Sequence, residues 1–103
     1  MRTLQVNLEI ETLELKKAAL RFRAINHSLR QDMLRFLHKR GRVAVTDVYV
    51  KLNLEQPVAS THLAILRRAN LVITQREGKF IFYSVNYQQL KHMHQIAERL
   101  VGG

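Results

Sequence analysis

The chain of 103 residues contains no cysteine, which excludes disulfides, thiolate metal sites and thiol-based redox sensing. It has no tryptophan, one proline and four glycines. Because proline and glycine interrupt helices and strands, these few residues indicate where elements end. No apolar run approaches the roughly 20 residues that a membrane-spanning helix needs, and the N-terminus lacks a signal-peptide pattern. We therefore expect a cytoplasmic protein with no membrane partner.

Acidic residues are also scarce: eight Asp and Glu stand against 17 Lys and Arg, which gives a formal net charge of +9. Residues 1–20 are balanced, and the whole excess lies after them. This charge favours a polyanionic partner, either nucleic acid or, less often, an anionic membrane surface. The alternative is a charge that serves solubility alone. Residues 1–103 fit one domain, whose modest core a dimer would help to complete.

The first part of the chain predicts two helices. Residues 3–10 alternate apolar and polar side chains, which is typical of a strand, although they could instead extend the following helix. Helical spacing then predicts a helix over 12–26 that is apolar on two faces, so one face needs a partner outside its own core. Ser28 and Gln31 fit a capping box at the start of a second helix over 28–40.

The middle of the chain, residues 46–70, predicts two short helices joined by a tight turn. Thr46 is a candidate N-cap of the first helix, and Asn53 is expected to end it because asparagine tolerates left-handed backbone. Pro57 stands where a first helical turn should be. The second helix runs from about 58 to 69. Its expected buried stripe is Ala59, Leu63, Leu66 and Ala69.

The last part of the chain predicts a hairpin over 71–86 and a helix over 87–101. The hairpin runs, 71–75 and 80–85, are rich in β-branched and aromatic residues, and the charged segment 76–79 with its glycine separates them. The whole order predicts an α+β, mostly helical fold: a winged helix-turn-helix with a β-hairpin wing and flanking N- and C-terminal dimerisation helices.

In a helix-turn-helix the second helix enters the major groove of DNA, so it needs one apolar side and one side of short polar or forked side chains. The helix after Pro57 meets this need, although alone it could be a plain amphipathic helix with a solvated face. The hairpin tip is placed to touch the DNA backbone or the minor groove. The expected base contacts are Gln56, Ser60, Thr61 and His62, and the expected phosphate contacts are Arg30, Gln31, Thr46, Arg67, Arg68, Arg76 and Lys79.

The segment from Leu54 to Val72 resembles the recognition-helix signature of the ArsR-type (arsenic-repressor-like) winged-helix regulators, which reads roughly L-S-Q-x-x-V-S-x-H-L-x-x-L-R-x-A-G-L-V. Residues 76–83 are similar to the family's wing, R-x-G-R-x-x-x-Y, and residues 26–30 resemble the turn before its second helix. The resemblance spans about residues 14–100. It implies a transcriptional repressor that dimerises through its first and last helices and covers a palindromic operator in double-stranded DNA.

The metal-sensing residues of that family are missing from this sequence. Its Cys-x-Cys site would fall at Ala44 and Thr46, and neither binds a soft metal. The family's zinc site on the last helix also lacks its ligands. His92 and His94 are two residues apart and point to different sides of a helix. We expect no metal and no cofactor, and the effector is left unassigned.

The expected homodimer interface follows from the apolar faces of the first and last helices. On the first helix, one face holds Leu15 and Phe22 and is expected to pack in the chain's own core, whereas the other is expected to meet the second subunit. The expected interface residues are Leu13, Leu20, Ala24, Leu90, Met93, Ala97 and Leu100.

Catalysis is not expected. Asp47, Ser60 and His62 have the residue types of a triad, but Ser60 and His62 are two residues apart on one helix and their side chains diverge. No glycine-rich phosphate loop or nucleophile elbow is present. Two alternatives to a sequence-specific regulator stay open: a non-specific architectural nucleic-acid-binding protein, and a winged helix whose basic face binds an acidic protein.

Overall fold

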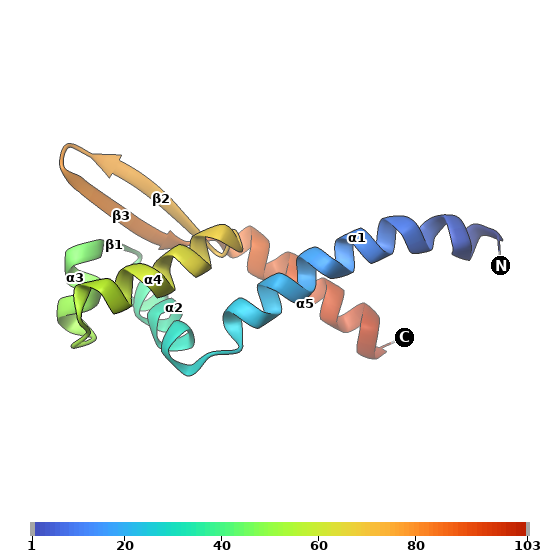
Figure 1. The fold of residues 1–103 in the computed structure, drawn as a ribbon, viewed down its shortest axis with the longest axis horizontal. Helices are drawn as coiled ribbons and strands as arrows, with labels where there is room; N and C mark the ends of the chain where they lie inside the picture. The colour runs from blue at the N-terminus through green and yellow to red at the C-terminus, as the bar shows by residue number, and fades with distance from the viewer. Residues whose placement is uncertain (1, 103) are drawn as a thin grey trace.

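The helices and strands follow one another in the order expected for a winged helix-turn-helix (Figure 1). The structure, a computed structural model, describes residues 2–102, and the side chains of residues 12–99. Three strands form one antiparallel sheet in the order β1-β3-β2. The elements are α1 (Arg2–Ile25), α2 (Ser28–Arg40), β1 (Arg42–Ala44), α3 (Val45–Lys51), α4 (Gln56–Arg68), β2 (Val72–Glu77), β3 (Phe80–Val85) and α5 (Tyr87–Gly102).

The core lies between α2, α3, α4 and the inner face of the sheet. Met33 and Leu37 of α2, Val48 of α3, and Leu63 and Leu66 of α4 are fully buried. The predicted buried stripe of α4 is confirmed. Truncating such a side chain costs roughly 2–5 kcal/mol, so this cluster fixes α4 on the body of the protein.

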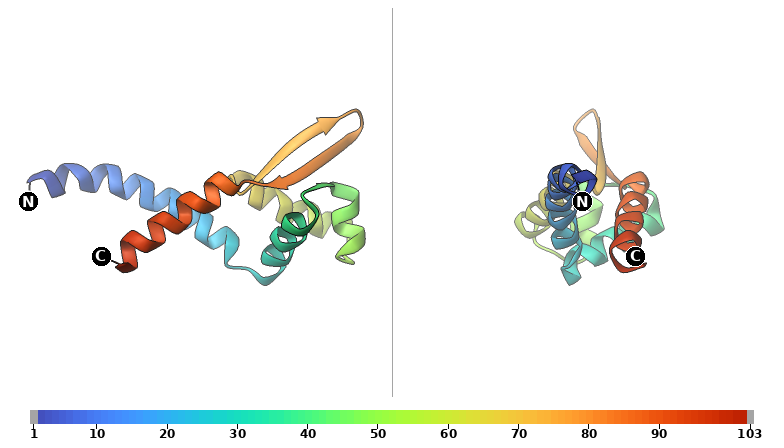
Figure 2. Two further views of the ribbon diagram at one scale, coloured as in Figure 1. Left: turned by 180° about the vertical axis from the view of Figure 1, so that it is seen from behind. Right: turned by 90° about the vertical axis from the view of Figure 1, so that its right-hand side faces the viewer.

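Helix α1 begins at Arg2, so the prediction of a strand over residues 3–10 is wrong and the alternative, an extended first helix, is confirmed. A lone strand there would leave its backbone N–H and C=O groups unpaired, whereas a helix pairs them internally. Helices α1 and α5 pack together and both extend away from the helix-turn-helix (Figures 1 and 2). The radius of gyration is 16.1 Å, against about 13 Å for a compact chain of this length.

Helix α2 begins at Ser28, as predicted, but the N-caps of α2 and α3 differ from the sequence prediction. The N-cap of α2 is His27, whose Nδ1 accepts a hydrogen bond from the Leu29 backbone N–H at 3.2 Å, so the capping box at Ser28 is wrong. The N-cap of α3 is Ala44 rather than Thr46. The physical reason is β1, a three-residue strand that ends at Ala44. Helix α3 follows it directly and begins at Val45, before the predicted N-cap. So short a strand shows no periodicity, and the sequence did not reveal it.

The predicted turn residues behave as expected. Asn53 and Asn70 have positive φ angles of 54° and 60°, and they follow the ends of α3 and α4. Pro57 lies in the first turn of α4. The wing turn is tighter than predicted, because β2 continues to Glu77 and only Gly78 and Lys79 separate the strands. Gly78 has φ +60°, which suits the first turn position of a type II′ hairpin.

Asn86 joins the wing to α5. Its Oδ1 accepts from the Gln89 backbone N–H at 3.2 Å, which caps α5, and its Nδ2 donates to the Asn70 carbonyl at 3.0 Å. Its own backbone N–H donates to the Leu71 carbonyl at 2.9 Å. One side chain therefore ties the end of α4 to the start of α5.

Substituting Asn86 by alanine is expected to destabilise the fold by about 1 kcal/mol through loss of the cap, and further through loss of the bond to Asn70. Asn86→Asp keeps the capping oxygen but not the donor, so its loss should be smaller. Urea unfolding measures both. Gln88→Ala, at an exposed position of the same helix, is the control, and an equal loss there would contradict the capping role.

Candidate nucleic-acid interface

Helix α4 presents two chemically opposite sides. Ala59, Leu63 and Leu66 are completely buried against the body. Gln56, Ser60 and Arg67 are exposed, and their spacing of four and seven residues places them on one side of the helix. The helix carries no acidic residue. Its outer side is thus a polar and cationic stripe of the kind that fits a major groove.

Thr61 is exposed beside this stripe. Its hydroxyl donates to the Pro57 carbonyl at 2.9 Å, so its oxygen still has lone pairs to accept a hydrogen bond from a base. Arg68, at the far end of α4, is exposed as well. Both residues stay in the predicted set, with a base-reading role for Thr61 and a phosphate-binding role for Arg68.

His62 occupies a different position from the other predicted base readers. It is half-buried, and its Nδ1 lies 3.1 Å from Nη1 of Arg30 in α2. Its ring centroid lies 4.8 Å from that of His27. Burial lowers the pKa of His62, and the nearby His27 and Arg30 lower it further. His62 therefore faces the α1–α2 junction, and we remove it from the base contacts.

Arg30 and Gln31 cap the C-terminal end of α1. Arg30 donates through Nε to the Ala24 carbonyl at 2.6 Å and through Nη2 to the Arg23 carbonyl at 3.3 Å. Gln31 Nε2 donates to the Ile25 carbonyl at 3.0 Å. These carbonyls are among those that a helix leaves unpaired at its end. Both side chains are engaged inside the chain, which favours a structural role over the predicted phosphate contacts.

The wing carries its cations on a braced hairpin. Arg76 and Lys79 are exposed near its tip, as predicted. Arg42, from β1, donates to Gln75 Oε1 at 3.0 Å, pairs with Glu77 Oε1 at 2.6 Å and lies 3.9 Å from the Phe82 ring centroid.

Arg42 is a functional candidate that sequence reasoning missed, because its partners lie more than 30 residues away. By pairing with Glu77 it neutralises a carboxylate that would repel DNA phosphates. The pair is exposed and adds little stability, so its main effect is to make the electrostatic potential of the wing tip less negative. Thr46 is exposed in the first turn of α3 and stays a predicted phosphate contact.

The predicted dimer residues fall into three groups. Leu13 and Leu20 are 57% and 52% exposed, whereas Ala24 and Met93 are each 3% exposed and belong to the chain's own core. The last two have almost no surface to offer a partner, so their assignment is corrected. Leu90 and Ala97 are half-buried, and the Leu100 side chain lies outside the described residues.

The two apolar faces predicted for α1 also need correction. Leu15 and Phe22, expected to pack in the chain's own core, are 42% and 37% exposed, while Ala18 is buried. Large apolar side chains thus remain uncovered on both predicted faces of the helix.

The described part of the chain offers neither a metal-ligand cluster nor a membrane-spanning helix. Its side chains include no group of three or more His, Asp or Glu placed to hold a metal ion. None of its helices combines the length and apolarity that crossing a bilayer requires.

Comparison with known proteins identifies relatives along most of the chain. No family model matches the sequence. The transcriptional activator HlyU of Vibrio cholerae is 30% identical over 95 residues, which span 92% of this chain and 87% of that protein. The solved structure of reduced HlyU has a TM-score of 0.70 at 31% identity, and covers 91% of this chain and 97% of that chain.

Two further relatives are named as repressors. The transcriptional repressor SdpR of Bacillus subtilis is 37% identical over 65 residues, 63% of this chain and 71% of that protein. The arsenical resistance operon repressor of Escherichia coli is 29% identical over 65 residues, 63% of this chain and 56% of that protein. The relatives have the function that the exposed stripe of α4 and the cationic wing indicate, which is DNA binding. The chain belongs to the ArsR-type family of winged helix-turn-helix, DNA-binding transcriptional regulators.

Proposed function

We propose that the protein is a homodimeric, sequence-specific repressor that binds a palindromic operator in the cytoplasm. The observation that carries the proposal is the exposed stripe of Gln56, Ser60 and Arg67 on a helix whose opposite side is fully buried. Gln56 and Ser60 would contact base edges, and Arg67 a phosphate. Arg76 and Lys79 would bind the backbone beside the same half-site.

The dimer is proposed from the uncovered apolar surface of α1. Leu13 and Leu20 lie on one face of a helix that extends away from the body (Figure 2). A single chain leaves these leucines in water, and a second copy related by a two-fold axis would cover them. Two-fold symmetry places two recognition helices about one turn of DNA apart, which is why a palindromic operator follows.

Repression is proposed to work by occupancy of the promoter. Occupancy needs no surface beyond the DNA interface and the dimer contact, and two of the relatives are named as repressors. The chain has no cysteine, so a thiol cannot switch it. The proposed function is binding alone, without a chemical step.

Selection from random duplex DNA tests the proposal, with the salt dependence of affinity measured on the selected sequence. The expected result is an enriched palindrome whose affinity falls steeply with salt, because each neutralised phosphate contributes a slope of about −0.9. Binding without enrichment would favour the architectural alternative. An absence of salt-dependent binding would favour a protein partner and overturn the proposal.

A further inference from the structure

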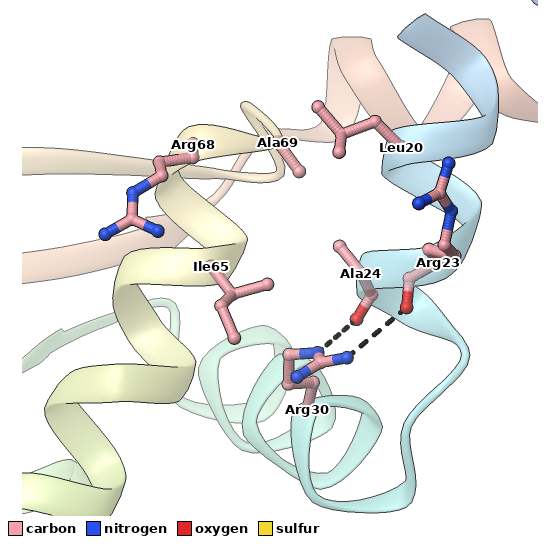
Figure 3. A pocket seen from close by; sticks show the side chains of 7 residues that line it. All are labelled: Leu20, Arg23, Ala24, Arg30, Ile65, Arg68 and Ala69. Atoms are coloured by element: carbon pink, nitrogen blue, oxygen red, sulfur yellow. Dashed lines mark hydrogen bonds between the residues drawn. The ribbon is translucent and has the colours of Figure 1, made fainter. Parts of the chain in front are cut away.

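One arginine links three helices behind the recognition surface. The Arg30 side chain, from α2, donates to the last-turn carbonyls of α1 at Arg23 and Ala24, and its Nη1 reaches His62 of α4. Figure 3 shows the two bonds to α1, with Arg30 below the gap between α1 and α4. Arg30 thus connects the end of the long α1 helix to the DNA-reading helix.

Side-chain packing leaves space between the two helices that Arg30 connects. A pocket of about 270 Å³ lies between α1 and α4, with Leu20 and Ala24 on one side and Ile65 and Ala69 on the other (Figure 3). Where apolar side chains do not interlock, they do not fix the angle between two helices. A directional hydrogen bond can fix it.

The bond between Arg30 and His62 sets a protonation requirement. A guanidinium has only donors, so Nδ1 of His62 must accept and must carry no proton. His27, whose ring lies beside that of His62, has the same requirement, because its Nδ1 accepts from the Leu29 backbone N–H. Adding a proton to either Nδ1 converts an acceptor into a donor that faces another donor.

We propose that Arg30 is a positioning residue that holds α4 in its DNA-binding orientation through neutral His62, and that acidification opens this link and weakens operator binding. The inference rests on the proposed function, because operator affinity is its main readout. It assigns Arg30 and His62 to the control of the interface, behind the residues that touch DNA.

The burial of His62 and the cationic groups beside it determine the direction of the pH effect. Burial, His27 and Arg30, in that order, lower its pKa from the ordinary 6.5. Both of these neighbours belong to the start of α2. In the described part of the chain, α1, α3 and β2, which also pack on α4, add no charged group to the causes of this shift. The neutral form is therefore favoured in the folded protein, and its stabilising contribution is present above the unfolded pKa and is lost as the pH falls through the folded one.

The first test separates positioning from phosphate binding. Arg30→Lys keeps the charge but loses the planar fork that reaches three acceptors. We expect affinity for the selected duplex to fall about tenfold with an unchanged salt slope, whereas Arg30→Gln at a phosphate contact would reduce the slope by about 0.9 per subunit, or about 1.8 for the dimer. A reduced slope for Arg30→Gln, or full affinity for Arg30→Lys, would overturn the proposal.

Gln31→Ala is the matched control. It removes a neighbouring bond to the end of α1 but leaves His62 untouched. Urea unfolding of all three variants shows whether they remain folded under the binding conditions. If Gln31→Ala lowers affinity as much as Arg30→Lys, the effect comes from capping α1, and the positioning role is refuted.

The second test uses pH. His62→Asn places an amide oxygen near the position of Nδ1 and does not titrate, and His27→Asn keeps a good N-cap. Between about pH 8 and about pH 5, wild-type affinity should fall about tenfold while the double variant stays nearly constant. An affinity that rises in acid, as added positive charge alone would cause, or equal pH profiles for both proteins, would refute the switch.

A readout without DNA distinguishes failure of this inference from failure of the proposed function. The NMR titration of the His62 ring should give a pKa below the ordinary value in the wild type, and Arg30→Lys should change it. If that titration behaves as expected but no duplex is selected, the regulator proposal fails and the Arg30 link stands. If His62 titrates as a free histidine, the link itself is absent.

Discussion

Replacing Leu13 and Leu20 together by glutamate is expected to produce monomers and to lower operator affinity by about 10²–10⁴-fold, since two linked half-site contacts become one. Both leucines are more than half exposed in the single chain, and neither belongs to the hydrophobic core cluster. Desolvating four carboxylates, two from each subunit, in a symmetric interface is costly. Sedimentation at micromolar concentration measures the assembly, and binding to the selected duplex measures the affinity.

Thr12→Glu is the control for added charge, because it places a carboxylate at an exposed position of the same helix. It should leave a dimer. If the double leucine variant also remains dimeric, the α1 surface is not the interface. If it becomes monomeric but binds the operator as tightly as the wild type, dimerisation is not what gives the affinity.

Replacing Gln56 or Ser60 by alanine is expected to cost about 1–3 kcal/mol per lost base contact. A two-fold dimer loses the contact in both half-sites, so the whole complex would lose about twice that amount. Both side chains are exposed on the outer side of α4, and stability should therefore change little. Titration of the selected duplex and of base-substituted duplexes measures affinity and preference, and the preference should relax where the lost side chain reads.

Arg67→Gln is the comparison for a phosphate contact. It should weaken binding to all duplexes alike and make the salt slope shallower. If Gln56→Ala and Ser60→Ala leave both affinity and sequence preference intact, α4 is not the recognition helix. If only the slope changes in these two variants, they bind phosphates and another surface reads the bases.

Local features of the chain made much of this fold predictable. The buried stripe of α4, Pro57 in its first turn and the left-handed Asn70 at its end all lie within one short segment. The wing likewise follows from two β-rich runs and Gly78. These patterns are formed by residues that are close in the sequence. The sequence alone was therefore enough to predict the outer side of α4 and the cationic tip of the wing.

The features that the sequence did not reveal depend on distant partners. His62 is two residues from Ser60, so the helical period already turns it away from the exposed stripe, but its contact with Arg30 follows only from the packing of α2 against α4. Arg42 has no local motif, since Gln75 and Glu77 reach it only when β1 pairs with β3. Residues 3–10 have a strand-like alternation, but a strand needs a pairing partner that a period of two cannot supply.

The Asn70–Asn86 contact holds the C-terminal end of the recognition helix, so a small rotation there produces a larger displacement at the N-terminal end. α4 rises about 1.5 Å per residue, so Gln56 lies about 20 Å from the end at which Asn86 joins it to α5. A rotation of a few degrees at this joint moves Gln56 by more than an ångström, while Gln56 itself is unchanged. Substitutions at Asn70 or Asn86 can therefore change the distance between the two α4 helices of a dimer. The preferred spacing of the two operator half-sites would change with it, although no residue that touches DNA is altered.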